Sequence, residues 1–169
     1  MNIIIVDKIR NKYSGLGRKV SDIKEIVIHG SGGGTAKGII EWMASYNCER
    51  KELYKQGIGL FHFMIDRNGD TYEILSPEVW AYHSESGFHD HTTIGIELVN
   101  PELLNAGDYT DEQYESLNTL IEKITGRFKI DIISSHDYNR KFYSGSKPKP
   151  CPGNKFDWDK INSDIRIFK

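Results

Sequence analysis

The chain has 169 residues, of which 38% are hydrophobic and 27% are charged, and its formal net charge is −2 at pH 7. This length suits one domain, 1–169, that buries about two-thirds of the surface of its unfolded chain. The charge provides no basic stripe for nucleic acid, and the apolar runs at 3–6 and 26–28 are far shorter than the roughly 20 residues of a membrane helix. We expect a monomer whose partners include neither nucleic acid nor membrane.

The first half of the chain alternates strand and helix signals. The β-branched run EIVIHG (25–30) predicts a buried strand that brings His29 to its end. Thr35 can then cap a helix over about 36–46. Residues 57–74 contain two apolar runs separated by a turn with Asn68-Gly69, the preferred hairpin dipeptide, and predict a β-hairpin.

A long segment without periodicity, 75–92, holds three of the six histidines. Long loops inside compact domains usually carry function. The next segment, TIGIELVN (93–100), predicts a strand in which Gly95 permits close approach of another group to the backbone.

The second half begins with the strongest helix signal. Thr110 opens a T-x-x-Q capping box, and the apolar residues up to Phe128 recur at helical spacing. KIDIISSH (129–136) predicts a strand ending at His136, and 156–168 is interpreted as a short closing helix. These elements together predict an α/β fold in which helices flank a mixed central sheet.

The stretch SKPKPCPG (146–153) holds a thiol in a stiff backbone. Proline fixes its own φ and biases the preceding residue toward extended geometry, so Lys149 and Cys151 should point to the same side. The only other cysteine is Cys48. A Cys48–Cys151 bridge remains open, but a secreted disulfide framework normally uses more cysteines, so we favour a free or metal-bound Cys151.

Three side chains could form a metal site. His29 and His136 each end a predicted strand, and Cys151 follows on the rigid loop. Two imidazoles and a thiolate favour zinc and leave a fourth position for water, as in catalytic sites. The alternative is that both histidines are structural residues that form hydrogen bonds at the strand ends.

Four motifs, IVIHGS, FHFMIDRNGDTYEI, IGIELVN and SSHDYN...KPKPCPG, stand in an order that resembles the zinc-dependent N-acetylmuramoyl-L-alanine amidases. That family includes phage lysozyme-like amidases and the peptidoglycan recognition proteins, and the resemblance covers about 22–160. It implies the amidase fold, zinc ligation by His29, His136 and Cys151, and a role for Lys149 near the scissile carbonyl.

The sequence departs from the family pattern at Phe61. Many members have a tyrosine before the histidine of the hairpin strand, as a partner of the zinc water, and Phe61 cannot exchange a proton. Other members carry a glutamate in the IGIEL strand, which corresponds to Glu97. The resemblance therefore implies that Glu97 is the base, unless it is a surface carboxylate of an edge strand.

Other aromatic and histidine residues are candidates for substrate contacts. His62 is expected near the site, and His83 resembles the family's histidine in the substrate-side loop. Phe61 and Trp80 are further candidates, although Trp80 could equally serve packing. His89 and His91 could bind metal, but a solvated loop is favoured.

The resemblance implies a hydrolase that cleaves the amide between N-acetylmuramic acid and L-alanine in peptidoglycan. The alternative is a recognition module that binds peptidoglycan fragments without cutting them. The start of the chain shows no export signal, so we expect cytoplasmic synthesis. This fits a bacteriolytic, antimicrobial phage-type endolysin that reaches the wall after release, or a recycling enzyme acting on soluble muropeptides.

Overall fold

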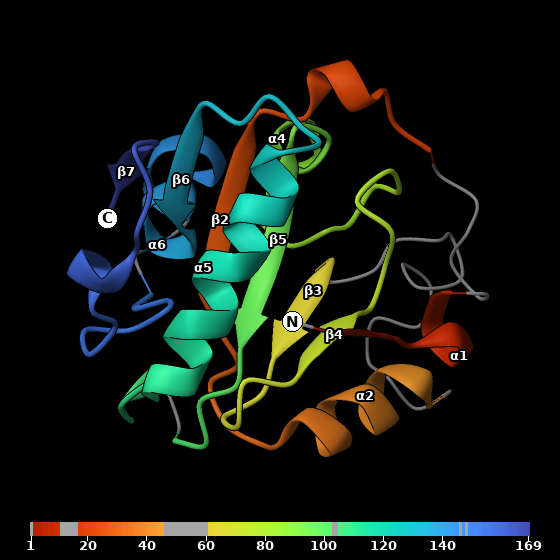
Figure 1. Ribbon diagram of the computed structural model, residues 1–169. Helices are drawn as coiled ribbons and strands as arrows, with labels where there is room; N and C mark the ends of the chain where they lie inside the picture. Colours follow the sequence, from red (N-terminus) through yellow and green to blue (C-terminus); the bar gives the residue numbers. More distant parts are fainter. Residues whose placement is uncertain (1, 11–16, 46–60, 103–104, 146, 148) are drawn as a thin grey trace.

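A computed structural model describes residues 2–10, 17–45, 61–102, 105–145, 147 and 149–169 (Figure 1). In this part of the chain, seven strands form one sheet in the order β1-β4-β3-β5-β2-β6-β7. Neighbouring strands are parallel except for the hairpin pair β3 and β4. The strands are β1 (Ile3–Ile5), β2 (Glu25–Gly30), β3 (Phe63–Ile65), β4 (Thr71–Glu73), β5 (Thr93–Leu98), β6 (Ile132–Ser135) and β7 (Arg166–Phe168).

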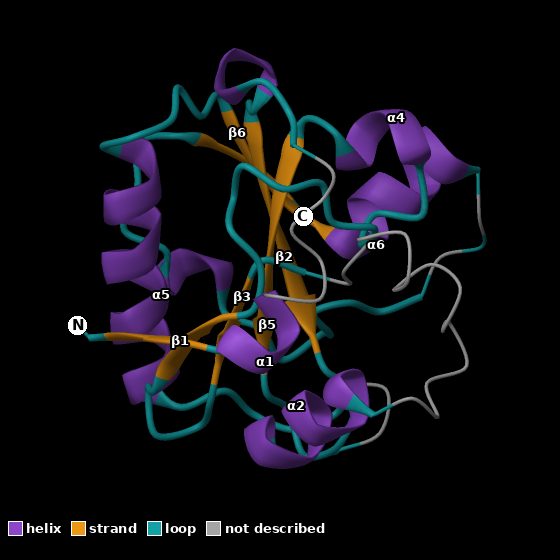
Figure 2. Cartoon of the chain, turned by 90° about the vertical axis from the view of Figure 1, so that its right-hand side faces the viewer, coloured by secondary structure: helices purple, strands orange, loops and turns teal. Residues whose placement is uncertain are grey.

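Helices cover both faces of the sheet. Figure 2 shows α5 (Asp111–Thr125) on one side and the short helices α4 (Gly87–Asp90) and α6 (His136–Asn139) on the other. The remaining helical segments are α1 (Asp7–Arg10), α2 (Ala36–Ala44), the 3₁₀ turns η1 (Val20–Asp22) and η4 (Trp158–Lys160), and the π-helical turn η3 (Arg140–Ser144). The expected mixed sheet flanked by helices is confirmed.

Strand alternation separates the core of the fold from its polar face. Ile26 and Ile28 of β2 pack with Ile94 and Ile96 of β5 in the cluster that α5 covers. Because successive side chains of a strand point to opposite faces, His29 points away from α5. The side chains of Thr93 and Glu97 do so too, so these two central strands carry polar groups on the side of α4 and α6.

Helix α5 begins where the sequence predicts. The Thr110 side chain accepts a hydrogen bond from Gln113 N, and the Gln113 side chain accepts one from Thr110 N, which completes the capping box. Gln113 Nε2 also donates to Val99 O at 2.9 Å. The same glutamine therefore caps the helix and ties it to the end of β5.

The predicted hairpin is confirmed for the described residues, since β3 and β4 pair antiparallel around the turn that contains Gly69. Residues 57–60 of that prediction, residue 46 of the predicted helix at 36–46, and Cys48 lie outside the described residues. Among the described helices, none combines the length and apolar character needed to cross a bilayer.

Two predictions near the C-terminus differ from the structure. The closing helix expected over 156–168 is wrong, because only η4 is helical there and Arg166–Phe168 form β7, which pairs with β6. The strand predicted to end at His136 ends at Ser135, and His136 begins α6 instead. In the first case, pairing with β6 favours a strand over the predicted helix. In the second case, the Ser135 cap begins a helix at the point where the strand was expected to continue.

Candidate metal and substrate site

The candidate site lies at the carboxyl ends of the central strands. His29 in β2 and Glu97 in β5 are directly paired in the parallel register, so their side chains leave the sheet on the same face. His136 follows β6 as the first residue of α6, where the Ser135 side chain accepts from Tyr138 N as a cap. Three adjacent strands thus bring these groups together.

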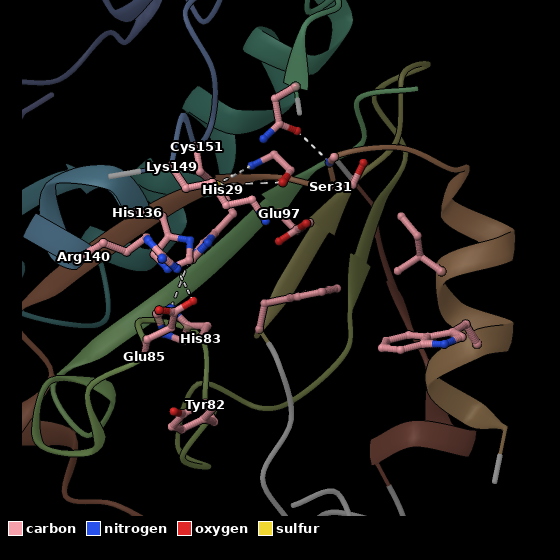
Figure 3. A pocket seen from close by; sticks show the side chains of 16 residues that line it. His29, Ser31, Tyr82, His83, Glu85, Glu97, His136, Arg140, Lys149 and Cys151 are labelled. Carbon is pink, nitrogen blue, oxygen red and sulfur yellow. Dashed lines mark hydrogen bonds and ion pairs between the residues drawn. The ribbon is translucent and has the colours of Figure 1, made fainter. Parts of the chain in front are cut away.

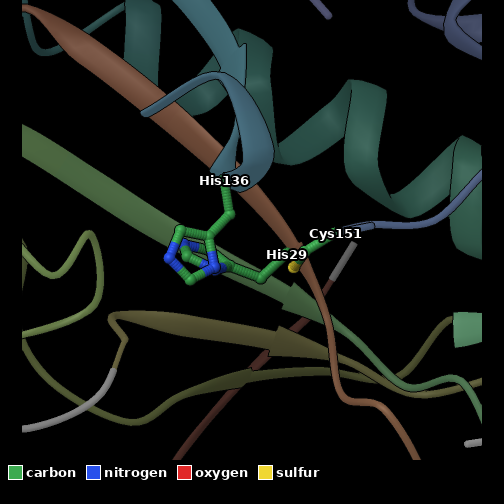
Figure 4. A group of neighbouring side chains, drawn as sticks. All are labelled: His29, His136 and Cys151. Carbon is green, nitrogen blue, oxygen red and sulfur yellow. The ribbon is translucent and has the colours of Figure 1, made fainter. Parts of the chain in front are cut away.

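Cys151 completes a group of possible metal ligands. One ligand atom from each of His29, His136 and Cys151 lies within 4.8 Å of the others (Figure 4). The His29 and His136 rings are 4.5 Å apart between centroids. Within the described part of the chain, His136 Nε2 is buried and has no hydrogen-bond partner. A buried nitrogen without a partner, beside a second imidazole and a thiol, fits a zinc ion.

Asp137 fixes the segment that carries Cys151 and Lys149. Its backbone N–H donates to Cys151 O at 3.1 Å, and its carboxylate accepts from Lys149 N at 2.9 Å. The Gly30 N–H donates to Cys151 Sγ at 3.4 Å. The thiol is therefore anchored to both elements that carry the histidines.

Asn105 connects the glycine-rich loop after β2 to the proline-rich stretch 146–153. Its Oδ1 accepts from Gly32 N at 2.6 Å, and its Nδ2 donates to Pro150 O at 3.3 Å. A Cβ on Gly153 would lie 2.4 Å from Asn105 O, so this close approach requires a glycine. The contacts define one wall of the cavity.

A cavity of about 490 Å³ opens beside the ligand group. Glu97 and Lys149 line it together with His29, His136 and Cys151 (Figure 3). Its remaining lining includes apolar and aromatic side chains, namely Ile39, Trp42, Phe61 and Tyr82. Such a mixture of apolar walls and a few converging polar groups is typical of a binding site for a small ligand or substrate.

Burial shifts the ionisation of the groups in this cavity. It raises the pKa of Glu97 to about 8, although the positive charge of Lys149 acts in the opposite direction. Desolvation lowers the pKa of His136 to about 4 and raises that of Cys151 to about 12. At neutral pH and without a bound cation, the His136 imidazole and the Cys151 thiol would be uncharged. A bound metal would stabilise the thiolate and would favour the ionised form of Glu97.

Several predicted residues are thus gathered at one cavity. His29, His136 and Cys151 line it with Glu97 and Lys149, and His83 and Phe61 also contribute to its lining.

Two predicted substrate contacts lie elsewhere. Of the residues that the structure describes, His62 and Trp80 are outside the lining. His62 is fully buried, and its Nδ1 accepts from Gly95 N at 3.0 Å. Trp80 stacks on His91 with the ring centroids 4.4 Å apart.

His89 takes part in a separate polar contact. Its Nε2 is 3.2 Å from Glu25 Oε2, at the opposite end of β2 from His29. The ring also stacks on Tyr143 at 4.0 Å. A structural role for His89 explains these contacts better than metal binding.

Sequence reasoning missed Asn105 and the ion pair between Arg140 and Glu85, all of which line the cavity. Arg140 follows His136 by four residues, and this spacing could have indicated a shared helix face. Asn105 has a positive φ of 58° in an irregular segment. No local sequence pattern predicts its contacts with Gly32 and Pro150, which lie 73 and 45 positions away in the sequence.

Comparisons with known proteins identify the family to which the sequence is similar. A family model described as N-acetylmuramoyl-L-alanine amidase matches residues 19–154. No curated protein sequence matches the chain.

Solved structures share the fold at low sequence identity. The amidase LysC from Clostridium intestinale URNW is 19% identical, with 95% of each chain covered and a TM-score of 0.68. Drosophila peptidoglycan recognition protein SD is 15% identical, with 98% of this chain and 96% of that chain covered and a TM-score of 0.70. Human PGRP-IBETAC, in complex with glycosamyl muramyl pentapeptide, is 14% identical, with 98% and 97% covered and a TM-score of 0.70. Because the family model spans most of the sequence, the chain belongs to the N-acetylmuramoyl-L-alanine amidase family.

Proposed function

We propose that the chain is a zinc-dependent hydrolase that cleaves the amide between the lactyl group of N-acetylmuramic acid and L-alanine in peptidoglycan. The observation that supports it most is the group of two imidazoles and one thiol beside a partly buried carboxylate and a lysine in one cavity. A binding module requires none of these groups to be arranged in this way.

His29, His136 and Cys151 would hold the metal. When bound, zinc acts as a Lewis acid that polarises the amide carbonyl and makes a water molecule more acidic. Three protein ligands leave a position open, which distinguishes a catalytic from a structural site.

Glu97 is positioned to act as the general base. It is paired with His29 across adjacent strands, and burial brings its pKa to about 8, closer to neutrality than that of a free carboxylate. A base is most efficient when its pKa lies near the working pH. Glu97 would accept the proton of the attacking water and deliver it to the leaving nitrogen of L-alanine.

Lys149 would stabilise negative charge on the carbonyl oxygen. Asp137 fixes the backbone of the segment that carries Lys149 through two hydrogen bonds, and the exposed lysine side chain lines the cavity. Prepositioned charge is a large contribution to the catalysis of acyl transfer.

One observation favours a recognition module instead. Phe61 is buried, lines the cavity and provides no group that exchanges a proton. Mass spectrometry of muropeptides separates the two functions. Incubation should release a lactyl carboxylate and a free L-alanine amine, and a chelator should abolish both. Binding of muropeptides without release of this amine at any metal concentration would favour the recognition module.

The physiological substrate follows from the same assay. A role as an endolysin predicts cleavage of intact cell walls, whereas a recycling enzyme would act on soluble muropeptides alone. The similarity to one solved endolysin, LysCS from Clostridium intestinale URNW, supports the endolysin, and we propose this role with a monomeric chain.

Metal content tests the ligand set directly. The purified protein should contain about one zinc per chain, and Cys151→Ser or His136→Ala should remove most of it. Elemental analysis measures this, with Cys48→Ser as the matched control, because Cys48 is the only other cysteine of the sequence and has no assigned role in the site. Full zinc content in Cys151→Ser would exclude the proposed ligands.

A further inference from the structure

His83 lies between a proposed zinc ligand and a buried hydroxyl. Its Nδ1 is 3.1 Å from His29 Nε2, and its Nε2 is 3.0 Å from Thr93 Oγ1. All three residues are buried. Figure 3 shows His83 beside His29 in the wall of the cavity. Both nitrogens of the His83 ring are thus occupied by protein groups, which leaves neither for a substrate.

The surroundings fix the His83 ring in this place. A Cβ on Gly95 would lie 2.8 Å from His83 Cγ, so the ring rests on the bare backbone of β5. The Asp90 carboxylate accepts from His83 N at 3.0 Å and from Ser84 N at 2.6 Å. The hydrogen bond to the backbone of His83 and the contact of its ring with Gly95 are independent observations. Together they indicate that the ring is held in one orientation.

Strand β5 provides three of the residues that surround His83 and His29. Thr93, Gly95 and Glu97 are spaced two residues apart and therefore share one face of the sheet. Thr93 bonds the distal nitrogen of His83, Gly95 makes room for the ring, and Glu97 is paired with His29. The strand that carries the proposed base thus also orients a ligand.

The hydrogen bonds determine which nitrogen of His29 can bind a metal. A ligating imidazole is neutral, with one nitrogen as donor and the other free to coordinate. If His29 coordinates through Nδ1, its Nε2–H must donate to His83 Nδ1. His83 Nε2–H then donates to Thr93 Oγ1. If the hydrogen bonds ran in the opposite direction, His83 Nδ1–H would donate to His29 Nε2. The proton of the neutral His29 ring would then occupy Nδ1 and prevent this atom from coordinating a metal.

We propose that His83 and Thr93 are positioning residues, which form a hydrogen-bond relay that holds His29 in the tautomer that binds zinc through Nδ1. This inference rests on the proposed zinc site and replaces the substrate contact that the sequence suggested for His83. Loss of such an outer-shell partner typically weakens metal affinity by about 10-fold to 100-fold.

The Thr93→Val variant tests the relay with little change in shape, because it replaces only the hydroxyl by a methyl group. Its zinc dissociation constant, measured by competition with a chelator, should rise by about 10-fold to 100-fold. Thr93→Ser is the matched control, since it restores the hydroxyl, and should bind zinc like the wild type. Equal weakening in both variants would indicate a packing role for Thr93 and would contradict the relay.

NMR of the histidine side-chain nitrogens in the zinc-loaded wild type is a second test, and it requires no variant. We expect a protonated Nε2 and a metal-bound Nδ1 on His29. Zinc on His29 Nε2, or a Thr93→Val variant with wild-type affinity, would overturn the relay while the zinc site stands. A wild-type chain that binds no zinc would instead refute the proposed function.

Discussion

Glu97→Gln is expected to lower kcat by about 10²-fold to 10⁴-fold, the contribution of a positioned general base. This corresponds to about 3 to 5 kcal/mol of activation free energy. Glutamine has the same shape but cannot accept the proton of the attacking water, so the variant should fold and retain zinc. Turnover is measured by release of the L-alanine amine, and zinc by elemental analysis.

The matched control for this variant is Glu122→Gln, which changes an exposed carboxylate on α5, away from the lining of the cavity. It should behave like the wild type. Phe61→Tyr should be close to neutral, because a hydroxyl does not replace a base that is already present. If Glu97→Gln remained active while the double variant with Phe61→Tyr gained activity, proton transfer would not depend on Glu97.

Lys149→Met should lower kcat by about 10²-fold to 10³-fold, the usual loss for one group that stabilises an oxyanion. The methionine side chain retains most of the length of lysine and lacks its charge. Binding of muropeptides should barely change, since the charge on the carbonyl oxygen develops only in the transition state. Steady-state kinetics together with a direct binding measurement separates the two effects.

Lys147→Met is the control, because Lys147 is an exposed lysine of the same segment and is not in the lining of the cavity. It should leave kcat unchanged. A Lys149→Met variant with nearly full kcat would show that Lys149 is a solvated loop residue, and that the rigid segment serves Cys151 alone.

The sequence by itself determined the elements whose signals are local. The capping box at Thr110, the turn at Gly69 and the β-branched run of β2 each depend on residues close together in the chain, and all three predictions are confirmed. The same is true of the prediction that Lys149 and Cys151 face one location, since both line the cavity. Local steric restriction by proline accounts for this success.

Only the tertiary structure decided which polar side chains meet. His62 and His83 are both buried histidines that precede β5 in the sequence. Gly95 leaves room for the ring of His83 beside His29. The backbone N–H of Gly95 donates to His62, which lies outside the lining of the cavity. Likewise, β7 exists because the edge of β6 offers unpaired backbone groups to a segment whose own pattern suggested a helix. The physical reason is the same in both cases. Strand register and packing place groups from distant parts of the chain within hydrogen-bond distance, and no local propensity encodes those distances.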